Sequence, residues 1–112
     1  MGKGSHLGEF EEIVMLAVAR AGADGHGAAI HEQILEATNR DVSIPAVYVT
    51  LSRLEKKGLV SSGVSLSGAD RGGRPRKVFE VTAAGVRELQ ASRLVQARLW
   101  EGLPFDPLGA GD

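Results

Sequence analysis

The most restrictive feature of this sequence is a change in its hydrophobic period at Gly58. Before this glycine, apolar residues recur every three or four positions in three stretches, Leu7–Ala21, residues 28–39 and Ala46–Lys57. This spacing predicts three amphipathic helices, since it places the apolar side chains on one helical face. After Gly58 the short, β-branched pattern of strands takes over, so an all-helical fold is excluded.

Two strands and a turn are expected next. Residues 59–66 are rich in β-branched and small side chains, and residues 76–82 alternate between apolar and polar. Residues 67–75 between them combine glycine, proline and charge, which is typical of a turn. The sequence therefore predicts a β-hairpin.

A fourth helix and two flexible termini complete the expected organisation. Thr82 can cap a helix over residues 83–102. We expect one compact domain over residues 7–82, a separate C-terminal helix, a flexible N-terminus at 1–6 and a flexible tail at 103–112.

Composition excludes several classes of function. The 112 residues are 43% hydrophobic and 24% charged, as in ordinary globular domains, and they include no cysteine, which rules out disulfides and thiolate metal sites. His6, His26 and His31 are not spaced as a metal site, and no nucleophile–base pair can be identified. We therefore predict no catalytic residue, no metal and no cofactor. No apolar stretch is long enough for a membrane span, so a cytoplasmic protein is expected.

Charge is segregated along the chain, although the formal net charge is only −1. Residues 42–77 contain seven basic and two acidic side chains, while the segments on either side are net acidic. Such a block is either a solvated face or a footprint for phosphate. It covers the third helix and the hairpin, and three helices followed by a hairpin form a winged helix-turn-helix. We therefore predict this mainly α (α+β) fold, whose third helix enters the major groove while the wing reaches the backbone or minor groove.

The sequence also resembles a known family. The motifs that carry the resemblance are HGAAIHEQI at 26–34, SIPAVYVTLSRLEKKGLV at 43–60 and GGRPRKVFEVTAAGVREL at 72–89. With these motifs, the chain from about residue 7 to residue 94 resembles the PadR family of bacterial transcriptional regulators. The resemblance implies a dimeric, DNA-binding repressor of the compact type with a single C-terminal helix.

The predicted DNA contacts lie on the third helix and in the wing. Val47, Leu51 and Leu54 are expected to pack inward, which leaves the opposite face of a recognition helix at about 45–57 free to enter a groove. The cations of the wing, residues 68–77, are separated by glycines that let the loop follow a phosphate backbone. The predicted DNA-binding residues are Ser43, Ala46, Tyr48, Val49, Thr50, Arg53, Lys56, Lys57, Arg71, Arg74, Arg76 and Lys77.

Some of these residues have alternative, structural explanations. Ser43 precedes Pro45 and can cap the helix without touching DNA. Tyr48 can be a half-buried core ring. Lys56 and Lys57 can serve the helix dipole, because cations are favourable near a helix C-terminus.

The last helix carries more apolar surface than a small domain needs to cover. The resemblance implies a homodimer built from Leu89, Leu94, Val95, Leu99 and Trp100, and the alternative is packing within the chain. A two-fold dimer predicts a pseudo-palindromic operator with half-sites about one helical turn, or a multiple of it, apart. Trp100, the only tryptophan, is also a candidate to hold a planar hydrophobic effector.

Two other functions remain open from the sequence. One is a ligand-sensing regulator whose small-molecule site lies at the dimer interface. The other is a winged-helix domain that contacts proteins, because this fold does not guarantee DNA binding. For the regulator we expect association with the nucleoid.

Overall fold

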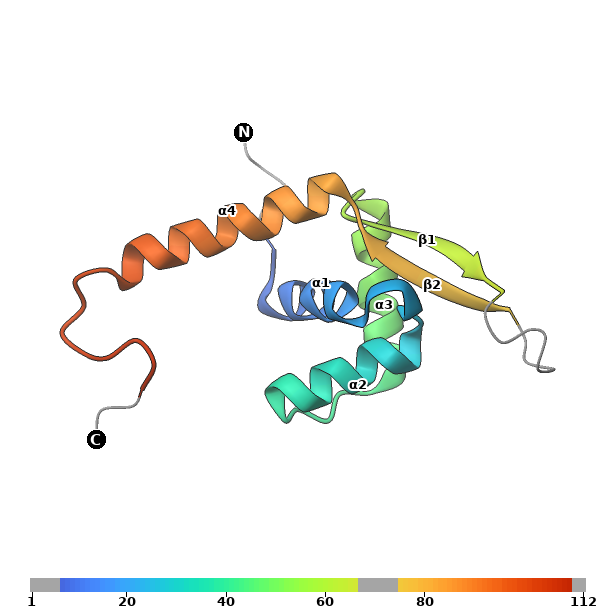
Figure 1. Ribbon diagram of the computed structural model, residues 1–112, viewed down its shortest axis with the longest axis horizontal. Coiled ribbons are helices and arrows are strands. Elements are labelled where there is room, and N and C mark those ends of the chain that lie inside the picture. The colour runs from blue at the N-terminus through green and yellow to red at the C-terminus, as the bar shows by residue number, and fades with distance from the viewer. Residues whose placement is uncertain (1–6, 67–74, 110–112) are drawn as a thin grey trace.

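Four α-helices and one antiparallel hairpin make up the part of the chain that the structure, a computed structural model, describes, which is residues 7–66 and 75–109. The elements are α1 (Glu9–Ala21), the short 3-10 helix η1 (Gly22–Asp24), α2 (Gly27–Thr38), α3 (Ile44–Lys56), β1 (Val60–Ser65), β2 (Arg76–Val81) and α4 (Ala83–Trp100). Figure 1 shows α1, α2 and α3 clustered, with the hairpin pointing away on one side and α4 on the other. The predicted winged helix fold is confirmed.

Local signals set the ends of the helices. The Ser43 hydroxyl accepts a hydrogen bond from the Ala46 backbone N–H at 3.1 Å, and Pro45 stands in the first turn of α3. Thr82 caps α4 in the same way, accepting from the Gly85 N–H at 3.0 Å. Gly58 adopts φ +77°, the left-handed conformation that ends α3.

A single core joins the first three helices to the hairpin. Its fully buried large side chains come from α1 (Val14, Met15, Val18), α2 (Ile30, Ile34), α3 (Val47, Leu51, Leu54) and β1 (Val60). From β2, Phe79 enters the same cluster and is 3% exposed. Because these side chains pack closely in one core, the orientation of α3 relative to the hairpin is fixed, and so are the positions of their outward faces.

The turn between α1 and α2 is attached to β2 by its backbone. His26 forms an isolated antiparallel bridge with Val78, and the Phe79 N–H donates to the Gly25 carbonyl at 2.8 Å. A β-carbon on Gly25 would lie 2.7 Å from the Phe79 carbonyl oxygen, so only glycine allows this approach. The start of α2 and the base of the wing therefore form one unit.

Helix α4 contacts the body of the protein through its first half. Gly85 is buried against the Leu59 carbonyl and Val81, Leu89 packs against the core, and the Ser92 hydroxyl donates to Glu12 of α1. The second half extends away from α1–α3 (Figure 1), which contributes to overall dimensions of 56 × 40 × 21 Å.

Candidate nucleic-acid interface

The outward face of α3 presents most of the residues predicted for it. Tyr48, Val49 and Arg53 are exposed, as is Lys56 in the last turn. The expectation that Thr50 lies on this outward face is wrong, because this residue is only 4% exposed.

Thr50 belongs to the inward stripe of α3. It lies three residues after Val47 and four before Leu54, a spacing that places all three on one side of the helix. The buried stripe is thus wider than the three apolar residues alone suggest, because a helix in a globular core commonly buries a face of 100° or more. Ala46 lies at its edge, half-buried.

Tyr48 is partly packed and partly exposed. Its ring meets Phe79 edge to face, with centroids 6.3 Å apart, and its hydroxyl lies over the start of α2 at Gly27. The side chain nevertheless remains 42% exposed. The ring is therefore packed along one edge, while part of the side chain stays exposed on the outward face of α3.

Lys57 is engaged within the chain. Its Nζ donates to both carboxylate oxygens of Glu11 on α1, at 2.9 and 3.1 Å. Burial by itself raises the pKa of Glu11, but the hydrogen bonds from Lys57 and the Gly8 N–H, with the charges of Lys57 and Arg53, outweigh it and hold the pKa below its ordinary value. Lys57 therefore anchors the end of α3 to α1.

The acidic side chain of α3 turns towards the hairpin. Glu55 accepts a hydrogen bond of 2.5 Å from the Ser62 hydroxyl of β1 and is half-buried. Arg53 and Lys56 stay exposed on the same helix. The accessible charge of α3 is consequently positive.

The wing is described only at its base, and Arg71 and Arg74 lie outside the described residues. Arg76 and Lys77 are both exposed at the start of β2. The Lys77 Nζ lies 5.5 Å from the centroid of the Phe79 ring, and the Arg76 Nη1 lies 3.1 Å from the His26 Nε2. Phe79 thus links the wing cation Lys77 to Tyr48 of α3.

His26 is a residue of this surface that the sequence did not single out. It precedes α2 and is 50 residues from Arg76, so no periodicity or spacing connects the two. The structure brings them together through the bridge to Val78.

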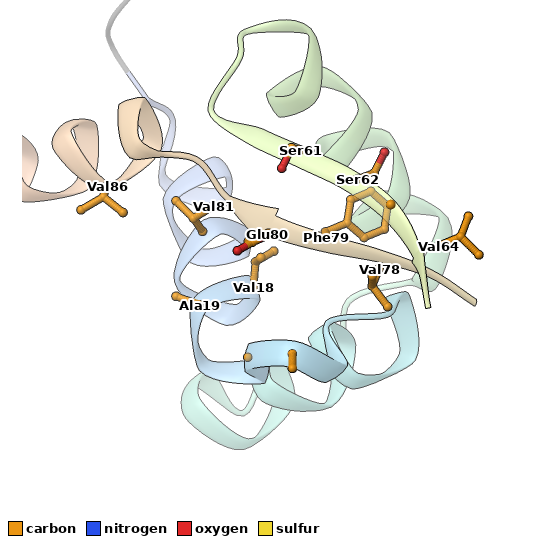
Figure 2. Close-up of a pocket in the computed structure, with 13 residues that line it drawn as sticks. Val18, Ala19, Ser61, Ser62, Val64, Val78, Phe79, Glu80, Val81 and Val86 are labelled. Atoms are coloured by element: carbon orange, nitrogen blue, oxygen red, sulfur yellow. The ribbon is translucent and has the colours of Figure 1, made fainter. Parts of the chain in front are cut away.

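An open groove of about 690 Å³ lies between the hairpin and the end of α1. Figure 2 shows Val18 of α1, Val78 and Val81 of β2 and Val86 of α4 around it. Trp100 does not line this groove; its ring packs edge to face on Phe105 in the tail, with centroids 5.8 Å apart.

Across residues 7–66 and 75–109, no three histidine or carboxylate side chains are grouped as metal ligands. No helix of the same residues is long and apolar enough to cross a membrane.

A winged helix whose third helix and wing base present basic side chains is an architecture that DNA-binding regulators use. Residues 15–91 match the model of the transcriptional regulator PadR-like family, and the chain belongs to this family. The family consists of transcriptional regulators rather than enzymes.

Solved structures with this fold come from several microbes. The chain is similar to a PadR-like transcription factor from Bacteroides fragilis, with 23% identity over 80% of this chain and 82% of that one and a TM-score of 0.65. It is also similar to a PadR family transcriptional regulator from Eggerthella lenta, with 25% identity, 81% and 79% coverage and a TM-score of 0.61. A putative transcriptional regulator from Thermoplasma acidophilum is similar too, with 22% identity over 78% of this chain and 85% of that one and a TM-score of 0.58. No functionally curated protein matches the chain.

Proposed function

We propose that the protein is a homodimeric, sequence-specific DNA-binding repressor that acts on the nucleoid, with α3 in the major groove and the wing on the backbone or minor groove. The observation that carries the proposal is the exposed basic surface shared by two elements. Arg53 and Lys56 of α3 and Arg76 and Lys77 of β2 are all exposed. A helix of this kind fits a major groove about 12 Å wide, and cations beside it neutralise the flanking phosphates.

Each exposed residue of α3 has a chemistry that suits one part of DNA. Arg53 can bind guanine O6 and N7 in a bidentate manner, or a phosphate. Val49, 57% exposed, offers an apolar contact to a thymine methyl group. The Tyr48 hydroxyl suits a phosphate oxygen. Ser43 already caps the helix, and Lys57 is held by Glu11, so we leave both out of the contact set.

The wing contacts are proposed on charge density. Arg71, Arg74, Arg76 and Lys77 lie within seven residues of sequence. Several cations so close together favour binding of the loop to a phosphate backbone, and arginine in particular enters narrow minor grooves. We assign the wing to the DNA flanking the site of α3.

Dimerisation through α4 is supported by apolar side chains that the chain itself leaves exposed. Leu94, Val95, Leu99 and Trp100 are 52%, 54%, 70% and 43% exposed, whereas Leu89 packs against the core. A small domain gains stability by burying such a surface against a second copy. Two-fold symmetry then pairs two copies of α3 with a pseudo-palindromic operator.

Fluorescence anisotropy with labelled DNA from upstream of the gene, against scrambled DNA, tests the proposal across about 50–200 mM salt. We expect a preference for the upstream DNA that persists at about 150 mM salt. Arg53→Ala should reduce this preference, because base contacts carry specificity. Arg20→Ala is the matched control, since it removes the same charge from an exposed side chain of α1 that donates to Gln33 of α2 and lies outside both α3 and α4.

The outcomes separate the candidate functions. Equal, weak and steeply salt-dependent binding to both DNAs contradicts sequence-specific regulation. No binding to either DNA contradicts the proposal altogether and favours a winged-helix domain that contacts proteins.

A further inference from the structure

We propose that His26 is a positioning residue for DNA binding, which holds the guanidinium of Arg76 in place at the base of the wing. The inference rests on the proposed DNA-binding function and adds to it a residue outside both α3 and the wing.

The hydrogen bonds of the imidazole fix its protonation pattern. The Arg76 Nη1 lies 3.1 Å from His26 Nε2, and a guanidinium only donates, so Nε2 must be the unprotonated acceptor. The His26 Nδ1 lies 3.0 Å from the Asp24 carbonyl oxygen, which only accepts, so Nδ1 must carry the proton. One neutral tautomer satisfies both contacts.

The backbone holds this imidazole at a fixed place relative to β2. The His26 N–H donates to the Asp24 carbonyl at 2.8 Å, and His26 pairs with Val78 two residues from Arg76. The neighbouring Gly25 accepts from the Phe79 N–H. His26 is therefore part of the rigid body of the domain, although its side chain reaches the base of the wing.

An arginine held in this way binds phosphate at a lower entropic cost. A free, exposed arginine loses much of its rotamer freedom when it binds, whereas a guanidinium that already donates to a fixed acceptor has less freedom to lose. Nη1 is used by His26, and the remaining N–H groups of the guanidinium can still reach an anion. Lys77, the next residue, is oriented by the Phe79 ring instead, so the two cations depend on different partners.

The test is a double-mutant cycle on the full chain, with anisotropy against the upstream DNA at several salt concentrations. His26→Ala should weaken binding about threefold to tenfold without changing the slope of log K against log salt, because His26 contacts no phosphate. Arg76→Ala should weaken binding and lower the magnitude of that slope by about 0.9. His26→Gln, whose amide oxygen can accept from Arg76, should restore most of the affinity.

The double variant distinguishes positioning from a separate contact. If His26 acts through Arg76, adding His26→Ala to Arg76→Ala weakens binding no further. Additive losses, or equal losses in the alanine and glutamine variants, would overturn the proposal. Absence of DNA binding by the unmodified protein contradicts the proposed function itself, whereas normal binding by His26→Ala overturns only this inference.

A measurement without mutation or DNA keeps the proposal testable should His26→Ala unfold. Long-range ¹H–¹⁵N correlation spectra of the unmodified protein at about pH 7.5 should show His26 with its proton on Nδ1 and a bare Nε2. A proton on Nε2 would be incompatible with a hydrogen bond from Arg76 and would overturn the assignment.

Discussion

The Tyr48 hydroxyl occupies the space that a side chain on Gly27 would need. A β-carbon built on Gly27 would lie 2.1 Å from the Tyr48 Oη, far inside van der Waals contact. The first residue of α2 and the outward ring of α3 thus pack directly against each other. Glycine is required here for this close approach rather than for a special backbone angle.

Gly27→Ala is expected to displace the Tyr48 ring and weaken DNA binding about threefold to tenfold by anisotropy. The melting temperature should change little, because the ring can swing into solvent and alanine favours the helix. In a Tyr48→Ala background the same substitution should have no effect on affinity. Gly63→Ala, which meets nothing within 4 Å, is the control. Unchanged affinity in Gly27→Ala would exclude Tyr48 from the DNA interface.

The pair of Glu11 and Lys57 should contribute measurably to stability. Glu11→Gln is expected to lower the free energy of unfolding at pH 7 by about 1–2 kcal/mol, a value moderated because Lys57 remains partly in water. Glu9→Gln breaks a second pair, with Arg40, whose side chains are far more exposed, and should cost less than about 0.5 kcal/mol. Urea unfolding of both variants checks the difference, and similar values for the two would contradict it.

The same pair predicts a pH dependence. The pKa of Glu11 is lower in the folded chain than in the unfolded chain. The stabilisation is therefore complete above the ordinary glutamate value of 4.5 and is lost as the pH falls through the lower folded value. The stability gap between the unmodified protein and Glu11→Gln should shrink steadily below about pH 4. A gap that stays constant down to pH 2.5 would assign the effect to packing instead.

Gly85, the one glycine of α4, is expected to tolerate no larger side chain. A β-carbon there would lie 2.2 Å from the Leu59 carbonyl oxygen, which belongs to backbone and cannot rotate away, and 2.7 Å from Val81. Gly85→Ala should lower the free energy of unfolding by about 2–3 kcal/mol, the cost of overpacking a closed contact. Chemical denaturation measures it, and a stabilised variant would mean that α4 is not docked as described.

Leu99→Glu should convert a dimer into a monomer. It places a charge on the most exposed of the large apolar side chains of α4, 70% accessible in the single chain. Light scattering after size exclusion should report half the mass, and operator affinity should fall at least about 100-fold, since the two half-sites are no longer bound together. Leu108→Glu, in the tail, should leave the mass unchanged. A dimer that survives Leu99→Glu must be joined elsewhere.

Features that depend on neighbours in sequence could be predicted well. Ser43, Gly58 and Thr82 all mark element ends, as expected, because caps and left-handed glycines act within three or four residues. Thr50 shows the limit of pattern analysis. A threonine next to the buried face of a helix can be either buried or exposed. Which of the two occurs depends on how much of α3 is covered by α1 and the hairpin, and the pattern of α3 alone does not show this.

Contacts between residues far apart in sequence could not be predicted. Glu11 and Lys57 are 46 positions apart, and His26 and Arg76 are 50 apart. Each pair meets because several elements are packed at once, and neither side chain leaves a periodic trace in the sequence. Gly27 is similar, because the group that forbids a β-carbon there belongs to α3.

A single residue, Thr82, separates the strand β2 from the helix α4. Its N–H donates to the Leu59 carbonyl at 3.0 Å and its hydroxyl donates to the Gly58 carbonyl at 2.8 Å, so the junction has little freedom to bend. β2 and α4 are consequently expected to move together as one rigid unit joined at Thr82. In a dimer joined through α4, the crossing angle of the two α4 helices would therefore set the distance between the two wings. That distance would in turn determine the spacing of the DNA half-sites that both wings can reach.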